Sequence, residues 1–385
     1  MVAYYAACCY LKVFKMNLSF QKLFFAIATV FALFAILVLA KTILIPLSIA
    51  LLISFILLPL VKKFEKWGMG KIFAAFLSIF AVLIIIGGVI YFFSTQIIDI
   101  AQEFTHFKDK IIGAFADVTL FINKHVSFMN DLGKDELFNR MKIWISSSTG
   151  SLVSKTVNTT AAFMAGLLAT IIFTFLFLIY RDGLTQAFLA FSSKDNRERV
   201  LGMFKSIQQV GQKYLFGMVI LTAIIGMANS LGLLIIGIDN PFLFGFLAAA
   251  LAIIPYIGTT IGAIIPIIYA FVSYGSIWTV IAVAILFWAV QLITDNFLTP
   301  RIVGGALKIN ALTAILSLFI GAAVWGLAGM VLFLPFAAML KVVCEEFEQL
   351  KPIALIIGEK NKKVDDGSEL FFVKWWKKAK DRLSG

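Results

Sequence analysis

The sequence is short of charge and of the residue types on which soluble catalysis usually depends. Only 14% of its 385 residues are charged, and it has two histidines and three cysteines. A soluble domain averages about 25% charged and about 45–50% apolar residues, whereas 61% of this chain is hydrophobic. One chain cannot hide that much apolar surface from water. The composition therefore argues against a soluble enzyme and predicts a polytopic, all-α transmembrane protein.

Motifs that define several other classes of protein are also missing. The sequence holds no G-x-x-x-x-G-K-[ST] loop for ATP, no H-E-x-x-H and no Cys/His set with metal-ligand spacing. Cys8, Cys9 and Cys344 give no disulfide framework, and no basic stripe with interleaved aromatic residues indicates a nucleic-acid partner. We therefore expect no catalytic residue, no metal, no cofactor and no bound nucleic acid.

Apolar stretches long enough to cross a lipid bilayer are numerous. A transmembrane helix needs about 20 such residues, because the hydrocarbon core is about 30 Å thick. Three full spans are predicted within 23–98, one at 156–180, one at 214–238 and one at about 277–297. The first apolar stretch runs directly into the second, so it does not have the form of a cleavable signal peptide.

Positive charge orients these predicted spans. The short loop 62–71 carries four lysines against one glutamate, which favours the cytoplasmic side. This places the leader 1–22, the helical linker 181–213 and the basic tail 342–385 in the cytoplasm, together with both chain termini. The segment 99–155 is then external, and its apolar residues recur every three or four positions, which predicts an amphipathic helical segment.

Two further apolar stretches have the wrong length for simple crossings and are interrupted near their centres. Residues 240–272 would form a helix about 50 Å long, too long for one crossing and too short for two. Proline and glycine in the segment 254–258, IPYIG, interrupt it. Residues 310–341 also begin with asparagine and have a glycine-rich centre. Within a core over 214–341 they predict an inverted pair of broken or re-entrant hairpins, a device of secondary transporters; bent full spans would instead give eight spans.

The polar end of the span at 277–297 is the first candidate site. Asp295 is the only acidic residue between Asp239 and Glu345, and an ionisable group at the end of a span is a functional candidate. It would bind a cation, shuttle a proton or pair with Arg301; a helix-end salt bridge at the interface is the structural alternative. The candidate path consists of Gln291, Thr294, Asp295, Asn296, Thr299, Pro300 and Arg301.

The interrupted helices are the second candidate, because unwound backbone exposes N–H and C=O groups at membrane depth. The ends of half-helices attract ions, anions at the N-terminus and cations at the C-terminus. The residues concerned are Pro255, Tyr256, Gly258, Thr259 and Thr260 in the first stretch and Gly326 and Gly329 in the second. A packed kink is the structural alternative. Asn229 and Ser230, in the span at 214–238, either line a path or bond a neighbouring helix, and we favour the second interpretation.

Three strings carry a resemblance to a known family: IIPYIG at 253–258, DNFLTPRIVGGALKINAL at 295–312, and a GLAG…LP…A pattern at 326–337. Together they resemble the autoinducer-2 exporter family over about residues 16–350. The resemblance implies a bacterial inner-membrane transporter without ATP hydrolysis, assembled as a homo-oligomer, with a pentamer as the implied form. The family pattern falls on Pro255, Tyr256, Gly258, Asp295, Asn296, Pro300 and Gly304.

These observations lead to a functional hypothesis with two alternatives. We expect a secondary transporter or facilitator that exports a small polar solute, such as a quorum-sensing signal, with H⁺ or Na⁺ as a possible coupling ion. A Na⁺(Li⁺)/H⁺ antiporter of the same family is one alternative. The other is a non-transporting oligomeric membrane scaffold, in which the broken helices are packed dry.

Overall fold

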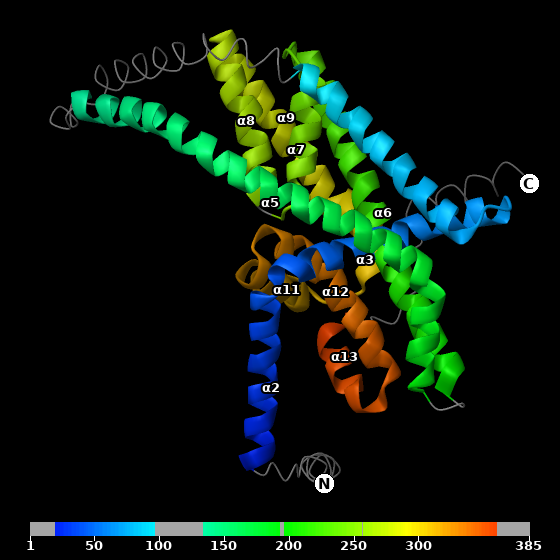
Figure 1. Cartoon of the computed structure of the whole chain (residues 1–385). Coiled ribbons are helices and arrows are strands. Elements are labelled where there is room, and N and C mark those ends of the chain that lie inside the picture. Colours follow the sequence, from blue (N-terminus) through cyan, green and yellow to red (C-terminus); the bar gives the residue numbers. More distant parts are fainter. Residues whose placement is uncertain (1–19, 97–133, 193–195, 256, 360–385) are drawn as a thin grey trace, which may run out of the picture.

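The structure, a computed structural model, describes residues 20–96, 134–192, 196–255 and 257–359, with backbone only for 20, 22, 23, 26 and 134–161. In this part of the chain every regular element is a helix, and one β-bridge joins Ile309 to Gly358. The first helices are α2 (Phe20–Leu39), α3 (Lys41–Lys66), an unlabelled helix (Lys71–Gln96), α5 (Lys134–Ala190) and α6 (Arg197–Ile236). They are followed by α7 (Pro241–Leu251), α8 (Ile257–Tyr274), α9 (Ile277–Ile293), the π-helical turns η2 (Thr294–Leu298) and η3 (Pro300–Gly304), α10 (Gly305–Leu307), α11 (Ala311–Trp325), α12 (Leu327–Glu346), the 3-10 turn η4 (Glu348–Leu350) and α13 (Lys351–Ile357). Figure 1 shows their arrangement, and the all-α prediction is confirmed.

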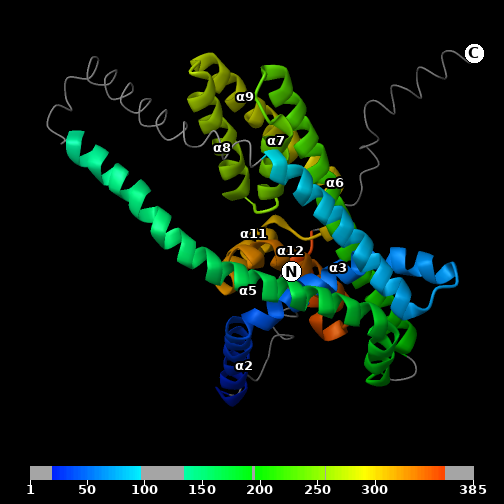
Figure 2. The same cartoon turned by 45° about the horizontal axis from the view of Figure 1, so that its top comes forward.

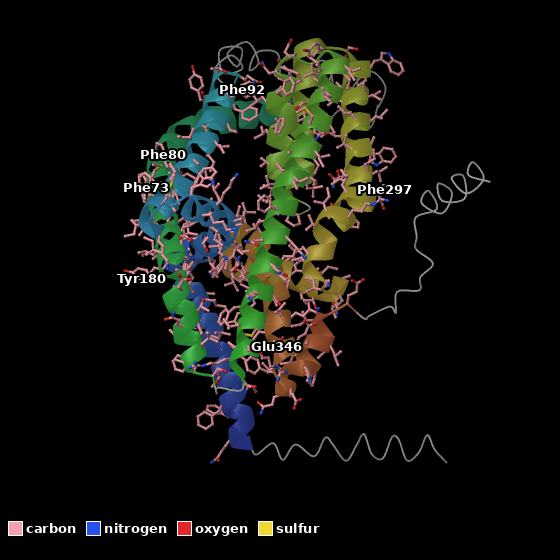
Figure 3. The ribbon with its side chains drawn as sticks, turned by 90° about the vertical axis from the view of Figure 1, so that its right-hand side faces the viewer. Phe73, Phe80, Phe92, Tyr180, Phe297 and Glu346 are labelled. Carbon is pink, nitrogen blue, oxygen red and sulfur yellow. The ribbon has the colours of Figure 1, made fainter. Side chains whose placement is uncertain are left out.

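Lengths and surface chemistry agree with a polytopic membrane protein. Within the described ranges, seven helices are long and apolar enough to cross a membrane. Large apolar side chains cover the outside of the molecule: Phe73, Phe80 and Phe92 project from one flank and Phe297 from the opposite one (Figure 3), each about half exposed or more. Water would not tolerate such a surface, whereas lipid does.

Both predicted interruptions are present as helical hairpins. The chain turns between α7 and α8, where Ile254 N–H donates to Leu251 O at 2.9 Å and Gly258 N–H to Ile254 O at 3.0 Å. The turn between α11 and α12 is a single residue, Gly326, with φ +61° and ψ −136°. Each hairpin pairs one helix of span length with a shorter one, since α7 and α11 measure only about 17 and 23 Å at 1.5 Å per residue.

Glycines allow the two arms of each hairpin to approach closely. A Cβ atom at Gly258 would overlap the backbone carbonyl of Leu251, and one at Gly262 would lie 2.9 Å from Ala248 Cα. In the second hairpin, Gly321 and Gly329 face each other and neither has room for a Cβ. These contacts explain why small residues are concentrated beside the breaks, as in other close helix pairs in membranes.

The helices α6 to α9 pack together around the first hairpin. Leu233, Phe244, Tyr269 and Phe287, one from each helix, are buried in one apolar cluster. The rings of Phe244 and Tyr269 lie 4.6 Å apart between centroids. Figures 1 and 2 show α7, α8 and α9 side by side in both views, with α11 and α12 below them. The first hairpin is therefore held in a bundle of its own.

Two helices continue through boundaries that were expected between segments. α5 runs without a break across residues 155/156 and 180/181, and α6 across 213/214. Neither helix contains proline, so nothing in their sequences forces the backbone to stop there. The first part of the predicted external segment, the leader up to residue 19 and the tail from residue 360 lie outside the described residues.

Charged side chains tie together the ends of helices from distant parts of the chain. Arg181 donates to both carboxylate oxygens of Glu65, at 2.6 and 2.7 Å, and Lys71 pairs with Asp182 at 2.5 Å. The loop 62–71 therefore lies beside the start of the linker 181–213. Just after the C-terminal end of α6, the carboxylate of Asp239 accepts a hydrogen bond of 2.8 Å from the hydroxyl of Tyr274, the last residue of α8.

Candidate functional site

The helix that carries Asp295 changes its winding at the predicted site. α9 passes into the π-helical turns η2 and η3, in which Thr299 N–H donates to Thr294 O, five residues back. Pro300 has no N–H to donate, so it cannot continue the regular ladder of α-helical bonds. Single π turns inside α-helices are rare and are frequent at functional sites. Here two of them in succession cover most of the DNFLTPRIVG string.

Side chains within this segment satisfy one another and their own backbone. Gln291 Nε2 donates to both carboxylate oxygens of Asp295, at 2.9 and 3.0 Å. Thr294 Oγ1 donates to Val290 O and Asn296 Nδ2 donates to Leu292 O, both at 2.8 Å. Thr294 is buried, whereas Asp295 and Asn296 are exposed. Gln291 is thus a direct hydrogen-bond partner of the Asp295 carboxylate.

Asp295 and Arg301 are separate in this structure. Both are exposed, and among the described residues no ion pair joins them. The adjoining turn η3 is fixed against α6, because a Cβ at Gly217 would lie only 2.9 Å from Ile302 O. Gly304 is exposed and has no such constraint, since its nearest neighbour would be Thr299 O at 3.7 Å. Gln291, rather than Arg301, is therefore the direct partner of Asp295.

A cavity lies between α6, α7, α8 and α9, and Gln291 forms part of its wall. Its volume is about 270 Å³. Its polar lining comes from three helices: Asn229 of α6, Thr259 and Thr260 of α8, and Gln291 of α9. Alanines and the rings of Phe287 and Trp288 form most of the remaining wall. The cavity combines an apolar wall with a few convergent polar groups, which is the usual composition of a small-molecule site.

Asn229, for which the sequence offered either a path-lining role or a bond to a neighbouring helix, is a polar residue of this cavity. It is only 3% exposed, and its Oδ1 has no hydrogen-bond partner among the described residues. Leaving a buried acceptor unpaired costs about 1–3 kcal/mol, so such an atom calls for an explanation. Its neighbour Ser230 packs against α7 but hydrogen-bonds within its own helix, because its hydroxyl donates to Gly226 O at 2.6 Å. A lone asparagine in an uncharged span was the only available signal.

The structure brings together part of each predicted set. Gln291 and Thr259 line one cavity, and Gln291 links that cavity to Asp295. Gly258 is buried in the α7–α8 hairpin that borders the cavity, with Pro255 in its turn, while Tyr256 lies outside the described residues. The lining does not include Pro300, Arg301 and Gly304 on the π-helical segment or Gly326 and Gly329 in the second hairpin.

The second hairpin has structural contacts of its own. The indole N–H of Trp325, next to the turn, donates to Leu37 O of α2 at 2.9 Å, and its ring packs edge-on against Phe333. Asn310 caps α11, since its side-chain oxygen accepts from Thr313 N–H at 2.8 Å. The two hairpins therefore differ in their surroundings: the first borders a polar cavity, whereas the tip of the second is anchored to α2.

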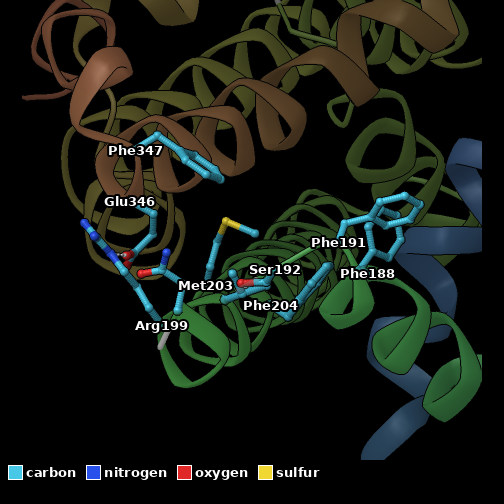
Figure 4. Close-up of a pocket in the computed structure, with 10 residues that line it drawn as sticks. Phe188, Phe191, Ser192, Arg199, Met203, Phe204, Glu346 and Phe347 are labelled. Carbon is cyan, nitrogen blue, oxygen red and sulfur yellow. Dashed lines mark hydrogen bonds and ion pairs between the residues drawn. The ribbon is translucent and has the colours of Figure 1, made fainter. Parts of the chain in front are cut away.

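A second cavity, of about 340 Å³, lies where the end of α5 and the start of α6 face the end of α12 (Figure 4). Arg199 and Glu346, its two charged lining residues, pair with each other at 2.9 Å at one end. Phe188 and Phe191 lie at the other end. The charges at this helix end neutralise each other, so the cavity at α6–α9 is the stronger candidate for a solute site.

The fold and this site define a multi-pass membrane protein with a polar cavity beside a broken helix, and comparison with known proteins gives the family. The family model described as "AI-2E family transporter" matches residues 23–349. The chain therefore belongs to the AI-2E transporter family, which is a family of transporters rather than of enzymes.

Characterised bacterial genomes supply similar proteins of nearly the same length. "Putative transport protein YrrI" of Bacillus subtilis (strain 168) is 25% identical, over 81% of this chain and 88% of the relative. "Putative transport protein YhhT" of Escherichia coli (strain K12) is 24% identical, over 83% and 89%. "AI-2 transport protein TqsA" of the same strain is 24% identical, over 84% and 91%. The similarity thus covers more than four fifths of this chain.

Proposed function

We propose that this chain is an ATP-independent transporter that moves a small polar solute through the α6–α9 cavity. The observation that carries the proposal is the placement of Gln291, which lines the cavity and also donates to both oxygens of Asp295. A change at the carboxylate is therefore passed directly to a side chain of the cavity wall.

Asp295 is the proposed coupling site for H⁺ or Na⁺. An ionised carboxylate accepts the Gln291 amide strongly, and a protonated one accepts it less well. Binding a proton or a cation at Asp295 would release Gln291 to bond a solute instead. This exchange couples occupancy of the carboxylate to occupancy of the cavity, and it also supports the second candidate function, a Na⁺(Li⁺)/H⁺ antiporter.

Further features of the proposal concern substrate, membrane and assembly. The name of the relative TqsA supports export of a quorum-sensing signal such as autoinducer-2. The pairs Arg181–Glu65 and Lys71–Asp182 join two segments that the positive-inside rule assigns to the cytoplasm. We therefore propose a bacterial inner-membrane protein with both termini cytoplasmic. The resemblance of its motifs supports a homo-oligomer, with a pentamer as the proposed form.

The test is flux across a pH gradient in proteoliposomes that contain the full chain. Asp295→Asn keeps the size of the side chain and one acceptor oxygen but removes the charge, so ion-coupled flux should be abolished while downhill solute flux persists. Asp239→Asn is the matched control, because this acid lies at the far end of α6 beside Tyr274. Size-exclusion profiles of both variants should match that of the unmodified chain.

The outcomes separate the candidate functions. Coupled flux that is unchanged in Asp295→Asn would remove the coupling role and leave a passive facilitator. Proton-driven sodium flux in the unmodified chain, without solute flux, would favour the antiporter. Absence of all flux would favour the non-transporting oligomeric scaffold.

A further inference from the structure

The unpaired oxygen of Asn229 is the feature that the coupling proposal does not use. Asn229 lies in the C-terminal part of α6 and lines the α6–α9 cavity, yet its Oδ1 has no partner in the described part of the chain. Buried side-chain oxygens in native proteins are nearly always hydrogen-bonded. The χ2 torsion of asparagine has a broad, roughly two-fold preference, so both orientations of the amide, including one with the oxygen toward the cavity, are compatible with it.

The wall of the cavity restricts what that molecule can be. None of its lining residues is Lys, Arg, Asp or Glu. An ion transferred into an apolar site without a charged partner is strongly disfavoured, whereas a neutral polar group needs only its hydrogen bonds. Besides Asn229, the polar residues of the wall are Thr259, Thr260 and Gln291. The aromatic rings of Phe287 and Trp288 supply apolar contact for the carbon atoms of a solute.

We propose that this cavity is the solute-binding site and that it takes a small uncharged molecule bearing hydroxyl donors, with Asn229 Oδ1 accepting a hydrogen bond from one hydroxyl. The inference rests on the proposed transport function and adds to it the binding residue and the solute class. Asn229 then determines specificity: a site with an acceptor that only a donor can satisfy rejects analogues that lack the donor. Asp295, outside the cavity wall, keeps the separate role of coupling.

The experiment uses the full chain in proteoliposomes with glycerol, erythritol and ribose as probes, followed by light scattering after an osmotic step. Asn229→Leu replaces the amide with an apolar group of similar size and should slow the uptake of the transported probes roughly tenfold. Asn229→Ala tests the same loss without adding bulk, in case the leucine disturbs folding. Ser230→Ala is the control, because Ser230 bonds only its own helix and does not line the cavity; its uptake should equal that of the unmodified chain.

Sodium uptake, measured with radiolabelled sodium in the same vesicles, distinguishes failure of the solute-site inference from failure of the proposed transport function. Uptake of the probes that is equal in the Asn229 variants and the unmodified chain would overturn the inference while transport stands. Sodium flux without uptake of any probe would also overturn it, because the cavity would then serve a cation. Absence of both fluxes would overturn the proposed function, and the inference would fall with it.

Discussion

Replacing Gly258 with alanine tests how closely α7 and α8 must approach beside the cavity. Gly258 is buried in the first turn of α8. A Cβ there would overlap the carbonyl oxygen of Leu251 and lie 3.1 Å from the backbone nitrogen of Ala252. These are backbone atoms, so no side chain can rotate to make room. The arms of the hairpin must separate, and Ala252 and Thr259, which line the cavity, must move with them.

Two opposing effects set the size of the change. In a helix, alanine is favoured over glycine by about 1 kcal/mol. Adding a methyl group to a fully packed site costs typically about 1–3 kcal/mol, and more where only backbone can yield. Because the overlap here is with backbone, we expect the packing cost to dominate. The net expectation is a loss of about 1–2 kcal/mol of stability.

Thermal unfolding in detergent, followed by tryptophan fluorescence at a fixed heating rate, measures the effect. Gly202→Ala is the matched control, since Gly202 lies inside α6, is exposed and has no atom within 4 Å of a built Cβ. We expect a lower midpoint for Gly258→Ala and an unchanged or higher one for Gly202→Ala. Equal midpoints for Gly258→Ala and the unmodified chain would refute the close approach of the two arms.

Two further predictions concern the second hairpin and the charged helix ends. Gly326→Ala should lower the unfolding midpoint, although open space surrounds the site. The reason is the backbone conformation, φ +61° with ψ −136°, which costs a residue other than glycine about 1–3 kcal/mol of strain. A midpoint equal to that of the unmodified chain would contradict this reasoning. Glu65→Gln and Arg181→Met, alone and combined, should show a coupling energy of about 1–2 kcal/mol, between the values for exposed and buried pairs, because the two side chains are 21% and 17% exposed. Strictly additive effects of the two substitutions would show that the bidentate contact contributes nothing.

The breaks were predictable because their causes are local. Proline and glycine act on their own turn of helix, so the segment 254–258 and Gly326 mark the interruptions without any knowledge of the fold. The membrane class was predictable from composition, since lipid requires apolar surface wherever the chain crosses it. The unequal lengths of the two helices in each hairpin were not predicted, because the sequences on both sides of each break are similarly apolar.

The features that depend on packing between helices could not be predicted from the sequence. α5 and α6 continue past the expected boundaries because polar residues join a helix as readily as apolar ones where no breaker intervenes. The π-helical winding around Asp295 follows from a missing donor at Pro300 combined with the contact of η3 on α6. The sequence left open whether Asn229 lines a path or bonds a neighbouring helix, and the arrangement of four helices shows that it lines a cavity.

Hydration of the α6–α9 cavity is the most direct test of a transport path. In a chain whose native cysteines are replaced by serine, Asn229→Cys and Ser230→Cys are treated in membrane vesicles with a small water-soluble methanethiosulfonate. A transport path predicts that Asn229→Cys is modified and that Ser230→Cys, buried against α7 at Gly245, is not. Protection of both cysteines would contradict a path through this cavity and would favour a dry scaffold.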